Sequence, residues 1–446
     1  MFRRDGTLYR SVSDVGMAKL DALHGSGLYD RLAGQGFLVE HESVDRGLAL
    51  EPHSAAMVIK PRELPFVSYP YEWCFGQLKD AALLTLEIQS QALDHGLTLS
   101  DASAFNVQFD GCRPVFIDTL SFEEYKPGLP WSAYRQFCQH FLAPLALVSR
   151  VDVRLATLTK NFIDGLPLDL AANILGRKGW FSPGLAAHVH LHSRSQERFR
   201  DSGGTAPKLP KVSLQGLRGI VDSLRRLVNS LQWKRGPSEW IDYYEANNNY
   251  AGVGLDEKER IVAEMSEAIG PRIVWDLGAN TGRFSRITAS QGAFTIAWDM
   301  DASCVEAHYC RVKDTSEIRL LPLVNDLTNP SPSLGWAHAE RDSLGVRANA
   351  QLSLALGLLH HLAIGNNVPL PQVMRWLRSL SPNVIVEWIP KEDSQVQRLL
   401  ATRSDIFPEY DLEGFERALR PYFDVAVQRA IPGTKRQLFL LVPRPD

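Results

Sequence analysis

The second half of the chain alternates short apolar runs with segments in which apolar residues recur every three or four positions. The apolar runs predict strands at 272–277, 294–299, 319–324, 352–357 and 383–389. The segments between them predict helices, among them 256–269, 302–312 and 370–380. Strands that alternate with helices are typical of an α/β fold with a parallel sheet covered on both faces. Two further alternating runs, near Phe423 and Arg436, predict an antiparallel hairpin that closes one edge of the sheet.

The first half has a different pattern and predicts an α+β domain. A long helix is expected from Gln77 to His95, where Gly96 ends it. Residues 97–118 then predict a strand that turns at Asp110-Gly111 and returns to Asp118. The region 126–200 is rich in helical patterns. Its aromatic residues at helical spacing are expected to be core: Trp131, Tyr134, Phe137 and Phe141.

A polar stretch rich in Gly and Pro, from Arg198 to Pro210, is the best candidate for a domain linker. Apolar residues then recur at three- and four-residue spacing from Leu214 to Leu231, with arginines between them, which predicts a basic amphipathic helix. Such a helix lies on a membrane, binds a partner or, more commonly, packs on a neighbouring domain. We therefore divide the chain into a domain at 1–200, a linker and helix at 201–250, and a domain at 251–446.

The strand at 272–277 ends in Asp276 and leads into a loop of small residues, Gly278-Ala-Asn-Thr-Gly282. Such a turn lets a cofactor approach the backbone closely. The next strand ends in Asp299, and a carboxylate about 20 residues after a Gly-rich turn suits the hydroxyls of a ribose. The loop lacks the G-x-G-x-x-G pattern of dinucleotide-binding folds and the G-x-x-x-x-G-K-[ST] pattern of phosphate-binding loops. These features predict a site for an adenosine-containing cofactor.

The same stretch resembles motif I of class I S-adenosylmethionine-dependent methyltransferases, in its D-x-G-x-N-x-G variant. The resemblance continues at Trp298-Asp299-Met300-Asp301, at Val324–Leu327 and at Leu352–Leu362 with its His-His pair. It implies a Rossmann-like, seven-stranded methyltransferase domain with S-adenosyl-L-methionine as cofactor, and the chain is similar to bacterial nodulation-type methyltransferases. The cofactor-binding residues that it implies are Asp276, Gly278, Asn280, Gly282, Asp299, Met300, Asn325, Asp326, Leu327 and Tyr250.

In this resemblance Asp326 contacts the adenine, and the segment from Trp240 to Tyr250 covers the cofactor. The aromatic residues of that segment either shield the sulfonium by cation–π contact or cap the domain without a functional role. The long insertion at 328–350 is expected on the acceptor side of the site.

Three residues near strand ends are candidates for the chemistry of methyl transfer. Because imidazole titrates near neutrality, His360 or His361 suits a base that takes the proton of a hydroxyl acceptor. The alternative is that one of these histidines only packs and hydrogen-bonds at the strand exit. Glu387, at the end of the fifth strand, has three open roles: it binds the acceptor, acts as a base, or pairs with an arginine such as Arg283.

In the first half, the pattern D-x-x-x-x-N followed by a hairpin and Ile-Asp resembles the catalytic loop of the kinase-like phosphotransferase fold. Carried over, this resemblance makes Asp101 the residue that orients a hydroxyl nucleophile, and Asn106 and Asp118 the residues that hold Mg²⁺. The Gly-rich loop of that fold is missing, and Lys60 is its only strand-lysine candidate. We therefore expect a degenerate, kinase-like domain. The alternatives are a working phosphotransferase and an unrelated hairpin.

Composition narrows the class of protein without identifying the acceptor. A net charge of −3 and a pI near 6.5 give no clear signal for nucleic acid, and no apolar run is long enough to span a bilayer. Five cysteines without a C-x-x-C pair suggest reduced thiols and a cytoplasmic protein. No metal site is expected, because three alternating histidines at 188, 190 and 192 are typical of a surface.

The predicted function is methyl transfer to an O or N nucleophile of a small molecule or glycan of secondary metabolism. The alternatives are a bifunctional kinase and methyltransferase and a non-catalytic S-adenosylmethionine-binding scaffold. The sequence does not reveal an oligomeric state.

Overall fold

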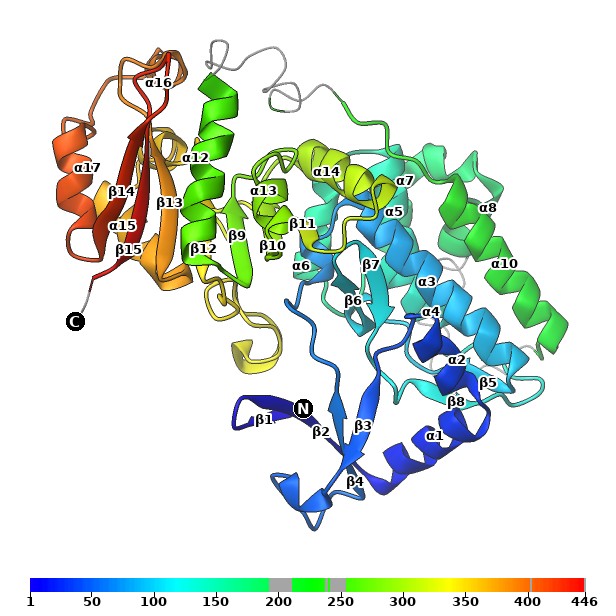
Figure 1. Ribbon diagram of the computed structural model, residues 1–446. Coiled ribbons are helices and arrows are strands. Elements are labelled where there is room, and N and C mark those ends of the chain that lie inside the picture. Colours follow the sequence, from blue (N-terminus) through cyan, green and yellow to red (C-terminus); the bar gives the residue numbers. More distant parts are fainter. Residues whose placement is uncertain (192–210, 237–239, 241–253, 402, 445–446) are drawn as a thin grey trace. The chain divides into compact units, whose positions relative to one another are not determined.

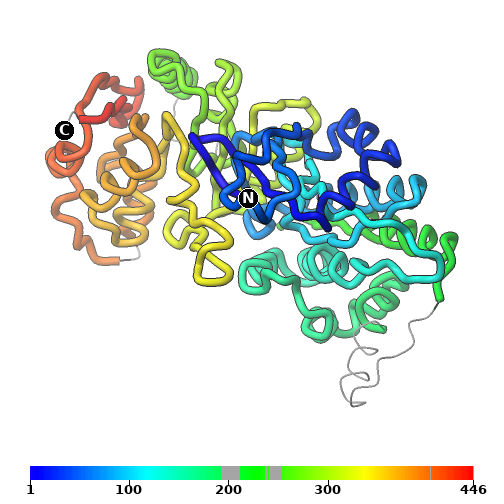
Figure 2. Tube along the Cα trace, turned by 90° about the horizontal axis from the view of Figure 1, so that it is seen from below, coloured from blue at the N-terminus to red at the C-terminus, as the bar shows by residue number. Residues whose placement is uncertain are grey.

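The computed structural model describes residues 1–191, 211–236, 240, 254–401 and 403–444. The chain divides into two compact units, Met1–Lys234 and Arg235–Asp446. In Figure 2 the first unit runs from blue to green and the second from green to red. No helix among the described residues is long and apolar enough to cross a membrane.

The second unit is built on one seven-stranded sheet with the order β11-β10-β9-β12-β13-β15-β14 (Figure 1). Its strands are β9 (Ile273–Leu277), β10 (Phe294–Asp299), β11 (Leu320–Val324), β12 (Leu352–Ala355), β13 (Asn383–Trp388), β14 (Phe423–Ala430) and β15 (Gln437–Pro443). The first five strands of this order are parallel, and β15 runs antiparallel to both β13 and β14. This is the strand order of class I methyltransferases, and the predicted fold of this half is confirmed.

Helices lie on both sides of this sheet (Figure 1). They are α12 (Gly254–Ile269), α13 (Ser285–Ser290), α14 (Ala302–Asp314), α15 (Leu370–Leu380), α16 (Ser394–Leu400) and α17 (Leu412–Leu419). Apolar side chains of α12, such as Ile261 and Met265, share one core with Val274, Leu354 and Ile385 from the sheet. From β9 the sheet continues to one side through β10 and β11, and from β12 it continues to the other side through β13. A ligand site is therefore expected where the carboxyl ends of these two strands diverge.

The first unit has a four-stranded antiparallel sheet in the order β1-β2-β4-β3. Two smaller pairs follow it, β5 with β8 and β6 with β7. The strands are β1 (Phe2–Arg4), β2 (Thr7–Val12), β3 (His41–Val44), β4 (Met57–Pro61), β5 (Leu97–Leu99), β6 (Val107–Asp110), β7 (Arg113–Phe116) and β8 (Phe122–Glu124). The predicted hairpin at 97–118 is therefore present as β6 and β7, enclosed in sequence by β5 and β8.

The helices of the first unit surround these strands in sequence. They are α1 (Asp14–Gly25), α2 (Leu28–Gly34), α3 (Phe75–Asp94), α4 (Tyr134–Phe137), α5 (Ala143–Arg150), α6 (Leu158–Asn161), α7 (Leu168–Trp180), α8 (Pro183–Leu185) and α10 (Leu214–Ser230). Of the predicted core aromatics, Trp131, Phe137 and Phe141 are buried, whereas Tyr134 is only partly buried.

The prediction that the alternating histidines lie on the surface is wrong for the two that the structure describes. His188 and His190 are buried, and His192 lies outside the described residues. His188 joins the Tyr134 hydroxyl (2.7 Å) to the Ser223 hydroxyl (2.9 Å), and His190 stacks on Trp180. The chain is irregular here, with a wide helical turn over Ala186–Leu191, so successive histidines do not alternate between core and solvent.

The amphipathic helix α10 packs on α3 within the first unit (Figure 1). Its buried residues are Leu217, Val221, Leu224, Leu227 and Val228. Two ion pairs flank this apolar face, Arg218 with Asp94 and Arg225 with Glu87, each at 2.8 Å. Of the alternatives open from the sequence, the structure shows packing on a neighbouring helix.

Candidate functional site

The loop that follows β9 is held by backbone contacts to the next strand. Its residues Gly278 and Gly282 have φ values of 79° and 76°, which L side chains rarely adopt. The N–H groups of Gly278 and Ala279 both donate to the carbonyl of Trp298 at 2.9 Å. Below the loop, the buried carboxylate of Asp276 accepts a hydrogen bond from the Ser285 hydroxyl at 2.6 Å. Burial raises the pKa of Asp276 to about 6.

Gly282 is required by packing. A Cβ atom built on this residue would lie 2.0 Å from the ring of His308, a buried residue of α14. No side chain fits there unless the buried ring of His308 moves. Gly282 therefore shapes the loop from behind, whereas Gly278 lines the pocket in front of it.

Asp299 ends β10 and connects two loops of the site. Its carboxylate accepts hydrogen bonds from the backbone N–H groups of Asn280 (2.7 Å) and Asp301 (2.8 Å). The N–H of Met300 acts on the same carboxylate, and since two carboxylate oxygens offer about four acceptor sites, the group keeps capacity for a hydrogen bond from a ligand. Burial raises the pKa of Asp299 to about 6, and the backbone hydrogen bonds oppose that rise.

A pocket opens at the carboxyl ends of β9, β10, β11 and β12, where the strand order diverges. Nine of the residues predicted from the sequence line it: Gly278, Asn280, Asp299, Met300, Asn325, Asp326, Leu327, His360 and His361. Asp276 and Gly282 lie in the same loop without lining the pocket, and Tyr250 lies outside the described residues. The structure thus brings most of the predicted cofactor residues to one cavity.

Trp240 also lines the pocket, in line with the expectation that its segment covers the cofactor. Its carbonyl accepts a hydrogen bond from the Asn280 side-chain amide at 2.7 Å. Its ring meets that of His361 edge-on, with 5.2 Å between the ring centres.

Three polar lining residues were not predicted from the sequence, namely Thr328, Asn366 and Gln395. Thr328 donates to the carboxylate of Asp326 through its N–H (2.9 Å) and its hydroxyl (2.6 Å). It begins the insertion at 328–350 that was expected on the acceptor side. Gln395 lies in the first turn of α16, and its position after the fifth strand was the only signal available in the sequence.

The two histidines lie together in the pocket, with ring centres 4.1 Å apart. His360 is buried, and burial holds its pKa well below the usual value, with further lowering by His361 and Arg436. The His360 ring is therefore neutral at physiological pH. It can donate or accept a hydrogen bond, but it is a weak proton acceptor.

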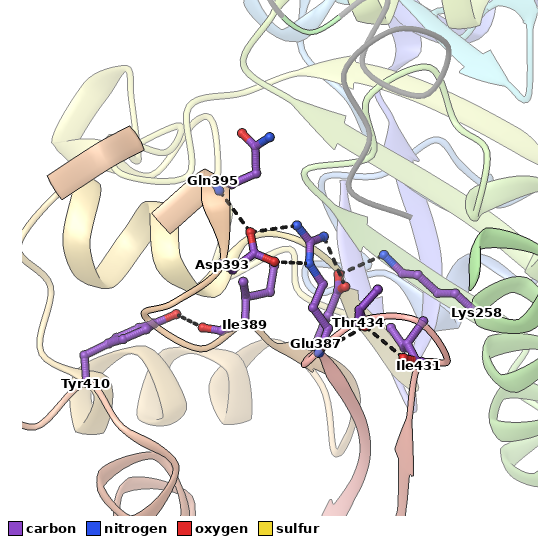
Figure 3. A network of polar contacts seen from close by, with 9 residues as sticks. Lys258, Glu387, Ile389, Asp393, Gln395, Tyr410, Ile431 and Thr434 are labelled. Carbon is purple, nitrogen blue, oxygen red and sulfur yellow. Dashed lines mark hydrogen bonds and ion pairs between the residues drawn. The ribbon is translucent and has the colours of Figure 1, made fainter. Parts of the chain in front are cut away.

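Glu387 belongs to a buried network of four charged side chains (Figure 3). Its carboxylate pairs with Lys258 at 2.8 Å and with Arg436 at 3.5 Å. Arg436 in turn binds Asp393 through two nitrogens, at 2.8 Å and 3.0 Å. Asp393 also accepts a hydrogen bond from the N–H of Gln395 at 2.9 Å and so caps α16.

This network changes the interpretation of Glu387. Its carboxylate is fully buried, does not line the pocket and lies behind Gly357, whose added Cβ would be 3.9 Å from Oε2. The suggested partner Arg283 pairs with Glu259 instead. A buried carboxylate held by two cations is a poor base, because protonating it would leave their charges uncompensated.

The residues that resemble a kinase catalytic loop lie together in the first unit. Asp118 accepts a hydrogen bond from Ser121 at 2.6 Å, and Ser121 contacts the Asn106 amide at 3.5 Å. Asp101 accepts from the N–H of Ser103 at 2.9 Å. The other oxygen of Asp118 accepts from the guanidinium of Arg10.

These contacts do not suit a divalent cation. Both oxygens of Asp118 are engaged, and one of them is neutralised by the arginine. A Mg²⁺ ion at this carboxylate would have to displace Arg10. Lys60 offers no replacement for the missing kinase machinery, because it pairs with Glu42 at 2.7 Å on the exposed side of β4.

No protein-family model matches the chain. Nodulation protein NoeA of Rhizobium meliloti (strain 1021) is 39% identical over 417 residues, which cover 92% of this chain and 87% of NoeA. The chain belongs to the NoeA family. The predicted likeness to nodulation-type proteins is therefore confirmed.

Among solved structures, the bifunctional kinase-methyltransferase WbdD is 16% identical, with a TM-score of 0.31, over 45% of this chain and 42% of WbdD. The N-methyltransferase NodS of Bradyrhizobium japonicum WM9 is 11% identical, with a TM-score of 0.33, over 44% of this chain and 99% of NodS. Magnesium protoporphyrin IX methyltransferase of Synechocystis PCC 6803 is 15% identical, with a TM-score of 0.33, over 47% of this chain and 90% of that protein. Likeness at this level supports no activity, so the strand order and the pocket must carry the functional conclusion.

Proposed function

We propose that the second unit binds S-adenosyl-L-methionine in the pocket at the ends of β9 to β12 and transfers its methyl group to an O or N nucleophile. The observation that carries this proposal is the position of Asp299. It lies at the end of the strand next to the Gly278–Gly282 loop, is held by backbone N–H groups and lines the pocket. A carboxylate in this place suits the two hydroxyls of a ribose.

The remaining lining fits the other parts of such a cofactor. Asp326 and Asn325 follow β11 and would hold the adenine, with Met300 and Leu327 as apolar neighbours. The cofactor supplies an activated methyl group, so the protein needs chiefly to hold the nucleophile in line with it. Trp240, whose carbonyl accepts from Asn280 of the cofactor loop, would cover the cofactor, and His361, whose ring contacts Trp240, would place the acceptor.

The charges of the pocket favour a cationic cofactor and an uncharged acceptor. Among the described lining residues there is no lysine or arginine, whereas Asp299 and Asp326 are both acidic. An acceptor that carries a phosphate or carboxylate next to its nucleophile would find no cation to pair with. A hydroxyl or amine on a neutral small molecule or glycan suits the amides of Gln395 and Asn366.

The neutral state of His360 limits its chemical role. We propose that it orients the acceptor by a hydrogen bond, and that any general base is His361. An amine acceptor would need no base before methyl transfer. We propose an acceptor from secondary metabolism and a cytoplasmic protein, as the sequence predicts; the relative NoeA is a nodulation protein.

Calorimetric titration of the full chain with S-adenosylmethionine tests the cofactor assignment. We expect saturable binding at one site, and competition by the demethylated product, S-adenosylhomocysteine. Binding without transfer to any acceptor in a metabolite extract would favour the scaffold alternative. Failure to bind the cofactor at millimolar concentration would contradict the proposal.

For the first unit, we propose a kinase-like domain that no longer transfers phosphate. The arrangement of β5, the 101–106 loop, hairpin β6–β7 and β8 follows the pattern expected for that fold. The Arg10–Asp118 ion pair and the outward position of Lys60 speak against a working site. Mg²⁺-dependent ATP hydrolysis by the full chain, lost in Asp118→Ala, would instead support the bifunctional alternative.

A further inference from the structure

The first unit contains a second cavity, separate from the methyltransferase pocket. It lies between the four-stranded sheet and hairpin β6–β7. Leu8 of β2, Ile59 of β4 and Ile117, which follows β7, give it apolar walls, with Val39 and Val67 beside them. A cavity of this kind favours a ligand with an apolar body.

Three arginines line this cavity, namely Arg3, Arg10 and Arg62. Each pairs with one carboxylate: Glu63, which also lines the cavity, for Arg3, Asp118 for Arg10 and Asp110 for Arg62. A guanidinium has five N–H donors, and these ion pairs use only some of them. The remaining donors are available to an oxyanion, because planar guanidinium groups match phosphate and carboxylate geometry.

Side chains alternate between the two faces of β4, and its charged residue Lys60 lies on the face away from the cavity. Ile59 and Pro61 line the cavity, whereas Lys60, between them, belongs to the opposite face and pairs with Glu42. The cations of the cavity are therefore arginines, and Lys60 provides a control of the same charge on the same strand.

Near Arg10 the cavity also contains the ring of His41. Its Nδ1 atom is buried and has no hydrogen-bond partner among the described residues. Burial, with the nearby His24 and Arg10, lowers the pKa of His41 to about 4, so the ring is neutral at pH 7. His41 therefore carries no charge at pH 7, and the charged groups in this part of the cavity are Arg10 and its partner Asp118.

We infer that this cavity is a binding site for an organic oxyanion of the phosphate class, held by arginine side chains and independent of any metal ion. Arg10 takes the place against Asp118 that a divalent cation would need, and it can turn spare donors to the ligand. The apolar walls hold the organic part. This inference goes beyond the methyl-transfer proposal and rests on residues of the first unit alone.

The test uses 1-naphthyl phosphate, which joins a phosphate to an apolar ring, titrated into the full chain in the presence of EDTA. We expect saturable binding, with inorganic phosphate bound at least fivefold more weakly because it lacks the ring. Arg10→Ala and Arg62→Ala should each weaken binding about tenfold, less than the loss of a full charge-assisted contact, because each arginine is shared with an internal carboxylate. Lys60→Ala should leave the affinity unchanged.

Asp118→Ala separates this site from a metal-dependent one by the sign of its effect. Removing the carboxylate frees Arg10 from its internal partner, so oxyanion binding should tighten severalfold. A metal-dependent site would lose binding in the same variant, and Mg²⁺ would strengthen binding by the wild type. Circular dichroism checks folding, and Arg10→Lys replaces Arg10→Ala if the alanine variant unfolds, with an expected intermediate loss.

Several outcomes would overturn the inference: no binding of naphthyl phosphate at millimolar concentration, a requirement for Mg²⁺, weaker binding in Asp118→Ala, or equal losses in Lys60→Ala and Arg10→Ala. Binding that S-adenosylmethionine displaces would place the probe in the second unit instead. Because the probe and its variants involve only the first unit, failure here leaves the titration with S-adenosylmethionine unaffected, and the reverse also holds.

Discussion

Substitution of Asp299 by alanine should weaken S-adenosylmethionine binding about thirtyfold, while leaving the fold of the second unit intact. In the free protein this carboxylate accepts two backbone N–H groups, from Asn280 and Asp301. Alanine leaves those donors without their partner in the free and bound states alike. Their loss therefore changes stability rather than affinity.

What changes affinity is the contact between the carboxylate and the ribose hydroxyls. A charge-assisted hydrogen bond contributes about 2 kcal/mol, and this corresponds to roughly thirtyfold in the dissociation constant. Asp299→Asn is the matched control, because it keeps the size and one acceptor oxygen but loses the charge. Its affinity should lie between those of the wild type and the alanine variant.

The pH dependence gives a second, independent readout. Since the pKa of Asp299 is raised to about 6, the carboxylate that binds the ribose is ionised at pH 7 and becomes protonated as the pH falls through 6. Wild-type affinity should then fall by up to tenfold per pH unit below that value, whereas Asp299→Ala should show no such decline. Isothermal titration between pH 5 and 8 measures both effects. An alanine variant that binds within twofold of the wild type would refute the assignment of Asp299 to the ribose.

Further predictions concern four other residues. Asp326→Asn should weaken cofactor binding less than Asp299→Ala, by threefold to tenfold in the same titration, because one acceptor oxygen survives. Asp276 has a pKa near 6 against 3.8 when unfolded, so its ionisation costs stability that is lost as the pH rises from 3.8 to about 6. In denaturant melts the free energy of unfolding of the wild type should therefore fall by about 2 kcal/mol from this group between pH 4.5 and pH 7.5, and Asp276→Asn should lack that decrease. The ring of His360, with its lowered pKa, should show no NMR titration between pH 6 and 8. Asp118→Ala should leave the dissociation constant for S-adenosylmethionine unchanged, because it lies in the other unit.

The cofactor half of the site could be predicted because its residues follow the ends of consecutive strands in the sequence. Each parallel strand ends in the same crevice, so Gly278, Asp299 and Asp326 could be placed together from the strand pattern alone. Gly282 shows where that reasoning stops. Position 282 needs a glycine because the ring of His308 lies directly behind the loop. That contact depends on how α14 packs, which the strand pattern does not reveal.

The role of Glu387 could not be predicted, because its partners come from distant parts of the chain. Lys258 precedes the sheet, and Arg436 belongs to the turn before β15. The sequence predicts that β14 and β15 form a hairpin, but the hydrophobic pattern does not say which of them lies next to β13. The same difficulty applies to Arg10 and Asp118, which form an ion pair although they are 108 residues apart in the sequence.

The inner position of β15 brings the turn before it to the carboxyl end of β13. Because β15 pairs with β13, the preceding Arg436 lies against both Glu387 at the end of β13 and Asp393 in the loop that follows. With Lys258 the network holds two positive and two negative side chains, so its net charge is zero. Removing any one member would leave a buried charge uncompensated, so the four positions depend on one another. Asp393 uses the same carboxylate to cap α16, and thereby fixes the backbone of Gln395 at the edge of the pocket (Figure 3). The position of Gln395 in the pocket lining is thus set by the strand order as well as by its own local sequence.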